Sequence, residues 1–137
     1  MIYTSYYGNL RYLSRMQDYQ LVAIANTAPV EGIARQKMFM PAWQLIQDFK
    51  TGHMTTEAWV EAYIKQLDAL GFNCIQDYLE QLENNNQDTA FLCYERPDMP
   101  CHRHILAEYL RRHSFDVREA DTYSNVPVWD VLPFYPD

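Results

Sequence analysis

A short, continuously apolar run at residues 21–25 constrains the fold of this chain more than any other feature. A strand with one face in water alternates apolar and polar residues, whereas a strand covered on both faces is apolar throughout. The run lies within residues 19–25, which we predict to be a strand. The run therefore predicts a strand in the interior of a sheet that is covered on its two faces. Residues 89–94 are predicted to form a further strand.

Two more strands are predicted at residues 1–7 and 115–119, which are rich in aromatic or β-branched residues. Between the strands, apolar residues recur at helical spacing. This spacing predicts helices at residues 10–16, 41–52, 55–71, 73–83 and 101–113. Thr55 and Asn73 are the predicted N-caps of the third and fourth of these helices, and Cys74 is expected to be a small buried side chain. Residues 30–40 are interpreted as a surface loop, with a flap over a pocket as the alternative.

Strands that alternate with helices predict an α/β fold. We expect a three-layer sandwich with a short, mostly parallel sheet of about four strands and helices on both faces. The length favours one domain over residues 1–137. Residues 122–137 are rich in proline but also apolar, so we expect an extended tail that packs on the domain or on a partner subunit.

Composition limits the classes of function. A net charge of −7 argues against nonspecific nucleic-acid binding, which requires clustered Lys and Arg. No apolar run is long enough to span a membrane, and Met1 is not followed by a signal-peptide pattern. Three cysteines predict a reduced, cytoplasmic protein without a disulfide framework. No cofactor is predicted.

The candidate site lies where the predicted strands end. Ligands of parallel sheets bind at the carboxyl ends of the strands. Residues 6–9, 26–29 and 95–103 leave three of the strands and should converge on one edge. We therefore expect Tyr6, Tyr7, Asn9 and Asn26 to form one wall of a small polar pocket, where the tyrosines can stack on a ring.

The opposite wall is predicted from the sequence LCYERPDMPCHRHILAEYL, which holds Cys93, Glu95, Cys101, His102 and Arg103. A helix N-terminus attracts anions and lowers the pKa of a thiol. Arg103 is a predicted ligand-binding residue, because a guanidinium binds phosphate or carboxylate with a fork of donors. Cys93 is also predicted to bind the ligand. Cys101 and His102 are candidate reacting groups, with Glu95 as a base or as their orienting partner. His104 is expected to face solvent or to act as a cap.

Alternatives for the same residues remain open. Cys93 can be buried packing, and Glu95 with Arg103 can be a structural clasp across the loop. A zinc site is disfavoured because the cysteines are eight positions apart and no second pair exists, so no metal is predicted. A phosphatase-type loop is disfavoured because Met99 stands where its arginine would be. A Cys93–Cys101 redox pair is geometrically allowed.

The combination Cys93-Tyr94-Glu95 and Cys101-His102-Arg103 resembles the domain-of-unknown-function family 488. Similarity to that family extends to residues 2–6, 49–52, 55–59 and 105–107 and to Tyr63, and so covers most of the chain. The family usually has an acidic-basic pair after the second strand, where this chain has Ala25-Asn26-Thr27. The resemblance implies a compact α/β domain with a candidate site at the quoted motif, and it carries over no activity.

Two hypotheses about function follow. In the first, the chain binds a small anionic, nucleotide-like molecule at the carboxyl edge of the sheet, with or without a reaction. In the second, it is a non-catalytic binding or regulatory protein that meets a partner, or a second copy of itself, through the apolar tail.

Overall fold

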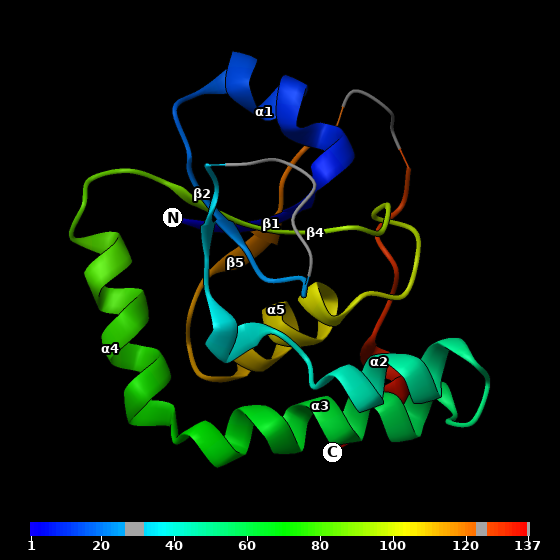
Figure 1. Ribbon diagram of the computed structural model, residues 1–137. Helices are drawn as coiled ribbons and strands as arrows, with labels where there is room; N and C mark the ends of the chain where they lie inside the picture. The colour runs from blue at the N-terminus through cyan, green and yellow to red at the C-terminus, as the bar shows by residue number, and fades with distance from the viewer. Residues whose placement is uncertain (27–31, 123–125, 137) are drawn as a thin grey trace.

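The computed structural model describes residues 1–26, 32–122 and 126–136, and it is an α/β structure built on one parallel sheet. The sheet has five strands in the order β3-β2-β4-β1-β5 (Figure 1). The strands are β1 (Ile2–Tyr6), β2 (Gln20–Ala23), β3 (Ala34–Arg35), β4 (Thr89–Cys93) and β5 (Val117–Glu119). All four pairings between them are parallel. The predicted α/β fold is confirmed, with five strands in place of about four.

Strand β4 is the centre of the sheet, and every residue in it is buried. Burial of this kind was predicted for the run at residues 21–25, in which Val22, Ala23, Ile24 and Ala25 are buried. The register places Tyr6 of β1 opposite Cys93, and Ala23 of β2 opposite Leu92. Strands β1, β2 and β4 consequently end at the same edge, as predicted, whereas residues 27–29 of the segment after β2 lie outside the described residues.

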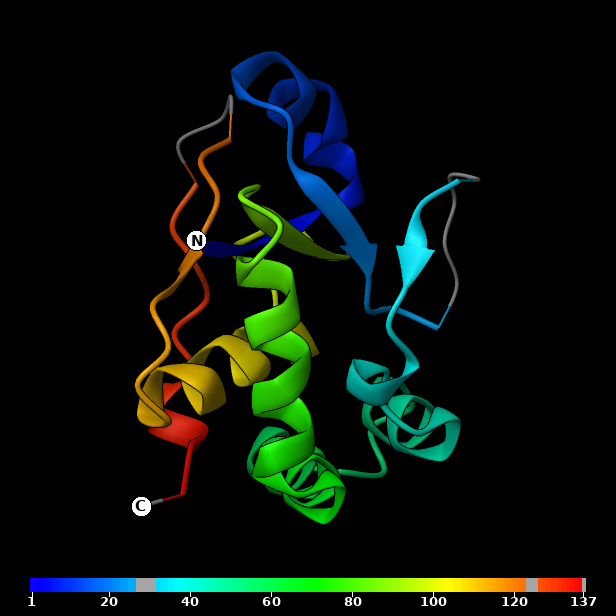
Figure 2. The same cartoon turned by 90° about the vertical axis from the view of Figure 1, so that its left-hand side faces the viewer.

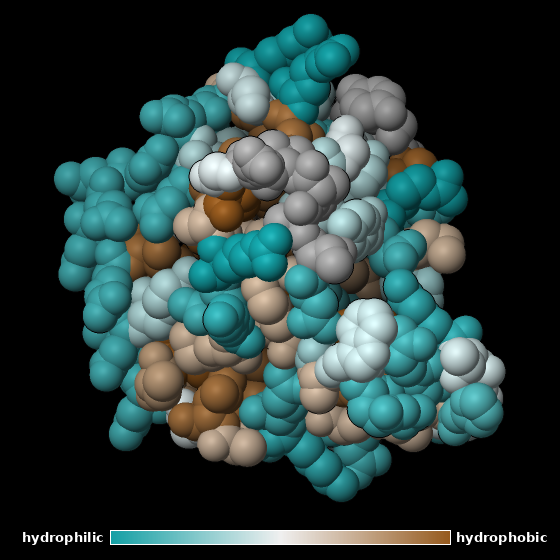
Figure 3. All heavy atoms as spheres, viewed as in Figure 1, coloured by the Kyte–Doolittle hydropathy of each residue, from teal (hydrophilic) through white to brown (hydrophobic). Residues whose placement is uncertain are grey.

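Helices lie on both sides of the sheet. Helix α1 (Leu10–Met16) is on one side, whereas α2 (Trp43–Lys50), α3 (Thr56–Leu70) and α5 (His102–Arg112) are on the other (Figures 1 and 2). Helix α5 packs directly on β1, β4 and β5, and α3 packs on α5. Helix α4 (Phe72–Glu83) borders the same group, and its outer side is hydrophilic in Figure 3.

Of the two predicted helix N-caps, the structure confirms the one at α3 and not the one at α4. The Thr55 hydroxyl accepts a hydrogen bond from the Ala58 amide at 3.1 Å, which confirms it as the N-cap of α3. Gly71, at φ +81°, ends α3 and also caps α4. The prediction that Asn73 caps α4 is therefore wrong, because glycine permits an abrupt change of direction directly before Phe72. Cys74 is exposed and not buried as expected, because it lies on the outer face of α4.

The segment at residues 30–40 contains a structure that the sequence did not suggest. Residues 27–31 lie outside the described residues. Beyond them, Ala34–Arg35 forms the edge strand β3 beside β2, and Lys37–Phe39 forms the short 3-10 helix η2. A two-residue strand with both side chains exposed has no apolar alternation, so periodicity cannot detect it.

The C-terminal tail crosses the domain and covers the loop before α5. The Trp129 amide donates a hydrogen bond to the Pro97 carbonyl at 2.7 Å. Val131 is buried, and the Trp129 ring lies 6.3 Å from that of Trp59. None of the helices in the described part of the chain combines the length and hydropathy needed to cross a lipid bilayer.

Candidate functional site

A cavity of about 450 Å³ opens at the edge where β2 and β4 end. Its floor comes from the residues that leave these strands and from the start of α5, and its outer wall comes from α2 and α3. The lining residues are Ala25, Asn26, Pro41, Trp43, Ile46, Phe49, Lys50, Trp59, Cys93, Tyr94, Glu95, Met99, Pro100, Cys101 and His102. The cavity therefore lies at the edge that the topology of a parallel sheet favours for ligands.

Aromatic rings make the outer wall apolar. Phe49 and Trp59 stack with their ring centroids 4.2 Å apart and nearly parallel planes. Trp43 is 63% exposed at the rim, so its ring is accessible to a ligand. Two charged side chains, Lys50 and Glu95, also line the cavity. The cavity thus combines a flat apolar surface with a few polar groups, as small-molecule sites usually do.

Two cysteines contribute to the cavity lining. Cys93 ends β4, and Cys101 is the N-cap residue of α5, and both are buried. Their sulfur atoms are joined as a disulfide, with the Cα atoms 7.6 Å apart. The expected reduced state is therefore wrong for this pair, and the alternative of a Cys93–Cys101 redox pair agrees with the structure, because the fold brings the two cysteines, eight residues apart, to the same strand end.

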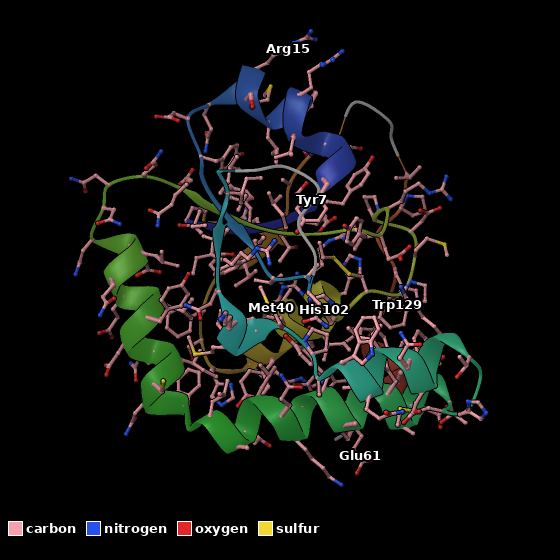
Figure 4. The ribbon with its side chains drawn as sticks, in the orientation of Figure 1. Tyr7, Arg15, Met40, Glu61, His102 and Trp129 are labelled. Carbon is pink, nitrogen blue, oxygen red and sulfur yellow. A yellow bond between two sulfur atoms is a disulfide. The ribbon has the colours of Figure 1, made fainter. Side chains whose placement is uncertain are left out.

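His102 is the first residue of α5 and is almost completely buried beside the cavity (Figure 4). Its Nε2 lies 2.6 Å from the Ile24 carbonyl oxygen. A carbonyl can only accept, so Nε2 carries the ring proton and Nδ1 is left with its lone pair. Nδ1 lies 3.8 Å from the Cys101 sulfur. Burial, helped by the nearby Arg103 charge, lowers the pKa of His102 to about 4, so the ring is neutral near pH 7.

Arg103 is the next residue, yet its side chain is fully buried and does not line the cavity. Its guanidinium donates from Nε and Nη2 to the two Glu119 carboxylate oxygens, the shortest distance being 2.8 Å. Nη1 donates to the Cys93 sulfur at 3.0 Å and to the Glu95 main-chain carbonyl. The anion-binding role of Arg103 stays a prediction, since its donors are engaged within the protein.

Glu119 is the acidic partner that sequence analysis missed. It ends β5 and stands opposite Thr4 of β1, whose hydroxyl donates to Glu119 Oε1 at 2.6 Å. Glu95 was the expected partner, but Glu95 contributes its backbone to Arg103 and has its side chain at the cavity. The signal available in the sequence was a carboxylate at the end of a predicted strand, and only the strand order places it beside Arg103.

The other predicted wall residues divide between two places. Asn26 lines the cavity, and its side-chain amide donates to the Pro41 carbonyl at 3.1 Å. Tyr6, Tyr7 and Asn9 are buried on the β1 side and do not line it. The Tyr7 ring packs edge-on against Tyr94 at 5.0 Å, and burial raises the pKa of Tyr7 to about 12. Ligand binding by these three residues stays a prediction.

Asn9 and His104 each hold a buried polar atom without a hydrogen-bond partner among the described residues. The Asn9 amide donates to Ser5 Oγ and to the Asp121 carbonyl, which leaves its Oδ1 unpaired. His104 is 4% exposed and not solvent-facing as expected, and its Nε2 is unpaired. Burial lowers the pKa of His104 to about 3, so the ring can stay neutral among its neighbours.

Comparison with known proteins agrees with the motif in the site. The family model described as "Active DUF488-N3 subclade" matches residues 10–114, which include the cysteines, His102 and Arg103. No curated protein and no solved structure matches the chain. Since the matched residues make up most of the sequence, the chain belongs to the DUF488 family, in the subclade DUF488-N3a.

Proposed function

We propose that this protein binds a small anionic molecule with a planar ring, of the nucleotide-like class, in the cavity at the carboxyl ends of β2 and β4. The observation that carries the proposal is the position of the cavity. It lies at the strand ends of a parallel sheet and is bordered by the N-terminus of α5. Its volume of about 450 Å³ falls in the range of small-molecule sites.

The side chains that line the cavity suit both the planar ring and the anionic group of such a ligand. The exposed Trp43 ring and the stacked pair Phe49–Trp59 offer apolar faces on which a flat ring can lie. Lys50 supplies a cation at the cavity, and the first turn of α5 supplies the positive end of a helix dipole. Glu95 is also there, and it favours a ligand that carries donors as well as an anionic group.

A ligand screen by thermal shift tests this proposal. Nucleotides and simple anions are compared with the uncharged nucleosides, and the expected hits contain both a ring and a phosphate or carboxylate. Lys50→Gln should weaken binding of a hit about tenfold, as expected for loss of one charge-assisted contact. Lys65→Gln is the matched control, since Lys65 is exposed on α3, where it pairs with Glu61, and does not belong to the cavity lining. Equal affinities for the two variants would show that Lys50 does not bind the anion.

The proposal extends to a reaction of the bound ligand in this cavity. Cys101 or His102 would be the reacting group, with Glu95 as its orienter, because all three line the cavity. After reduction, thiol labelling across a pH range measures the pKa of each cysteine. A Cys101 thiol that reacts no faster than a model thiol near pH 7 would exclude it as a nucleophile.

The second candidate is a non-catalytic binding protein in which the motif is a structural clasp. The buried contacts of Arg103 with Glu119, Cys93 and the Glu95 carbonyl favour it, because they join β4, β5 and α5. A partner, or a second copy, would then meet the tail, where Val128 and Leu132 remain exposed. A screen without hits, together with a tail-dependent mass increase in light scattering, would favour this candidate over the first.

A further inference from the structure

Cys93, Cys101 and His102 offer three metal-ligand atoms that all lie within 4.8 Å of one another, and all three residues are buried. Spacing along the sequence hides this group, because Cys93 ends a strand while Cys101 and His102 begin the helix that follows it. The three residues also line the same cavity. A metal ion bound here would therefore have protein on one side and the cavity on the other.

We propose that the reduced form of this protein binds Zn²⁺ through the Cys93 and Cys101 thiolates and His102 Nδ1, with the fourth coordination position open to the cavity. Two sulfurs and one imidazole suit zinc, and three protein ligands with one free position are typical of zinc sites that bind a water or a substrate atom. This inference goes beyond the proposed function, and metal binding can be tested whether or not the cavity holds an organic ligand.

The histidine is oriented as a metal ligand requires. Its Nε2 donates to the Ile24 carbonyl at 2.6 Å, which fixes the tautomer and the ring plane. Nδ1 is left unprotonated at 3.8 Å from the Cys101 sulfur. Zinc bond lengths of about 2.3 Å to sulfur and about 2.0 Å to nitrogen give a tetrahedral S···N edge of about 3.5 Å. A small rotation of either side chain thus suffices.

The environment of the sulfur atoms also suits thiolates. Arg103 Nη1 donates to the Cys93 sulfur at 3.0 Å, and a nearby guanidinium stabilises a thiolate. The Arg103 charge is balanced by Glu119, so it adds little net positive charge beside the metal. Two thiolates then neutralise Zn²⁺ in a place where an uncompensated charge would be costly.

The disulfide and the metal site are two states of the same pair of cysteines. The Cα separation of 7.6 Å exceeds the usual disulfide span of about 4.4 to 6.8 Å, so the backbone suits two separate sulfurs. Two equivalents of a thiol reductant convert the disulfide to two thiols and leave the oxidised reductant. Metal binding then releases the two thiol protons to solvent.

Metal titration of the reduced full-length protein tests the inference. The protein is purified with a non-thiol reductant, stripped with a chelator and titrated with Zn²⁺ against a chromophoric indicator. We expect one ion per chain. Titration with Co²⁺ should give intense sulfur-to-cobalt charge-transfer absorption together with the visible bands of tetrahedral cobalt. Absence of that absorption from the reduced, folded wild-type protein would overturn the inference without recourse to any variant.

Variants then identify the ligands. Cys101→Ser and His102→Gln should each weaken zinc binding at least about 100-fold, since even outer contacts of zinc ligands change affinity by about 10- to 100-fold. Cys74→Ser is the control, because Cys74 is exposed on α4 and outside the site, and it should bind zinc as the wild type does. Wild-type affinity in Cys101→Ser, or loss in Cys74→Ser alone, would contradict the assignment. A failed ligand screen with a positive cobalt spectrum would reject only the proposed organic ligand.

Discussion

His102 and Arg103 are neighbours in the sequence, yet they belong to different parts of the molecule. His102 lines the cavity at the ends of β2 and β4. Arg103 points to the other side of β4 and is bound by Glu119 from β5. The first turn of α5 therefore separates a cavity side, formed with Cys101, from a buried ionic side. The difference teaches that adjacent residues of one motif can take separate places, one in the lining of a cavity and one in a contact that secures the fold.

The largest expected effect comes from breaking the ionic side. Arg103→Met leaves the Glu119 carboxylate buried without its cation, which should lower the free energy of unfolding by about 3 to 5 kcal/mol. Urea unfolding followed by circular dichroism measures it. Arg118→Met is the matched control, because Arg118 is exposed beside Asp116 and should change stability by less than about 0.5 kcal/mol.

A double variant distinguishes loss of the pair from loss of packing. Arg103→Met combined with Glu119→Leu removes both charges, so it should recover much of the stability lost in the single variant. A double variant as unstable as Arg103→Met alone would mean that packing, and not the unpaired carboxylate, causes the loss.

A smaller loss is expected for the hydroxyl that supports Glu119. Thr4→Val keeps the shape of the side chain but removes the 2.6 Å hydrogen bond to Oε1, so stability should fall by about 1 to 3 kcal/mol. The control is Thr51→Val, whose hydroxyl bonds an exposed carbonyl at the end of α2. Similar losses for both variants in the same urea assay would argue against a special role for the ionic side.

A substitution on the cavity side should change ligand affinity and leave the stability of the fold almost unchanged. Trp43→Ala removes a ring that is 63% exposed, so stability should change by less than about 0.5 kcal/mol. Affinity for a ring-containing ligand should fall about tenfold, since stacking on an aromatic side chain contributes about 1 to 3 kcal/mol. Calorimetry with a hit from the screen gives the affinity. Unchanged affinity beside a large loss of stability would reverse the contrast between the two sides.

The smallest effect is expected at a half-buried ion pair, which is compared with the buried pair of Arg103 and Glu119. The hydrogen bond from Gln17, together with the N-terminal ammonium, holds the pKa of Asp88 below its usual 3.8. A carboxyl group whose pKa is lower in the folded than in the unfolded state stabilises the protein at any pH above its unfolded-state pKa. This stabilisation is lost as the pH falls through the folded-state pKa. Asp88→Asn should therefore cost less than about 1 kcal/mol at pH 7 and almost nothing at pH 2. A penalty that grows on acidification would contradict this sign.

Sequence patterns predicted the sheet interior well because burial on both faces leaves a continuous apolar run, as at residues 21–25, where Val22, Ala23, Ile24 and Ala25 are buried. They also predicted that the ends of β1, β2 and β4 converge, since this follows from parallel strands. Strand β3 was not predicted, because its two exposed residues show no alternation of apolar and polar side chains. The position of Cys74 was wrong because a small, weakly polar side chain is compatible with either side of a helix.

The sequence predicted a candidate site at the ends of β1, β2 and β4, but not the side-chain pairings found there. The structure places Cys93, Cys101 and His102 in the lining of a cavity at this edge, and their binding and catalytic roles stay predictions. Glu119 could not be assigned to Arg103, because that contact depends on β5 lying beside β1, far from it in the sequence. Strand order is set by the whole fold, so no local pattern reports it.

The division of roles at the start of α5 also sets a rule for insertions and deletions. Consecutive residues of a helix point about 100° apart, so one residue inserted between His102 and Arg103 would turn the guanidinium away from Glu119. A residue added at 96–99 would lengthen the loop and shift its contacts with the tail, but it would leave the first turn of α5 intact. In members of this family with the same architecture, we expect the length before the cysteine to vary while the Cys-His-Arg triplet stays uninterrupted.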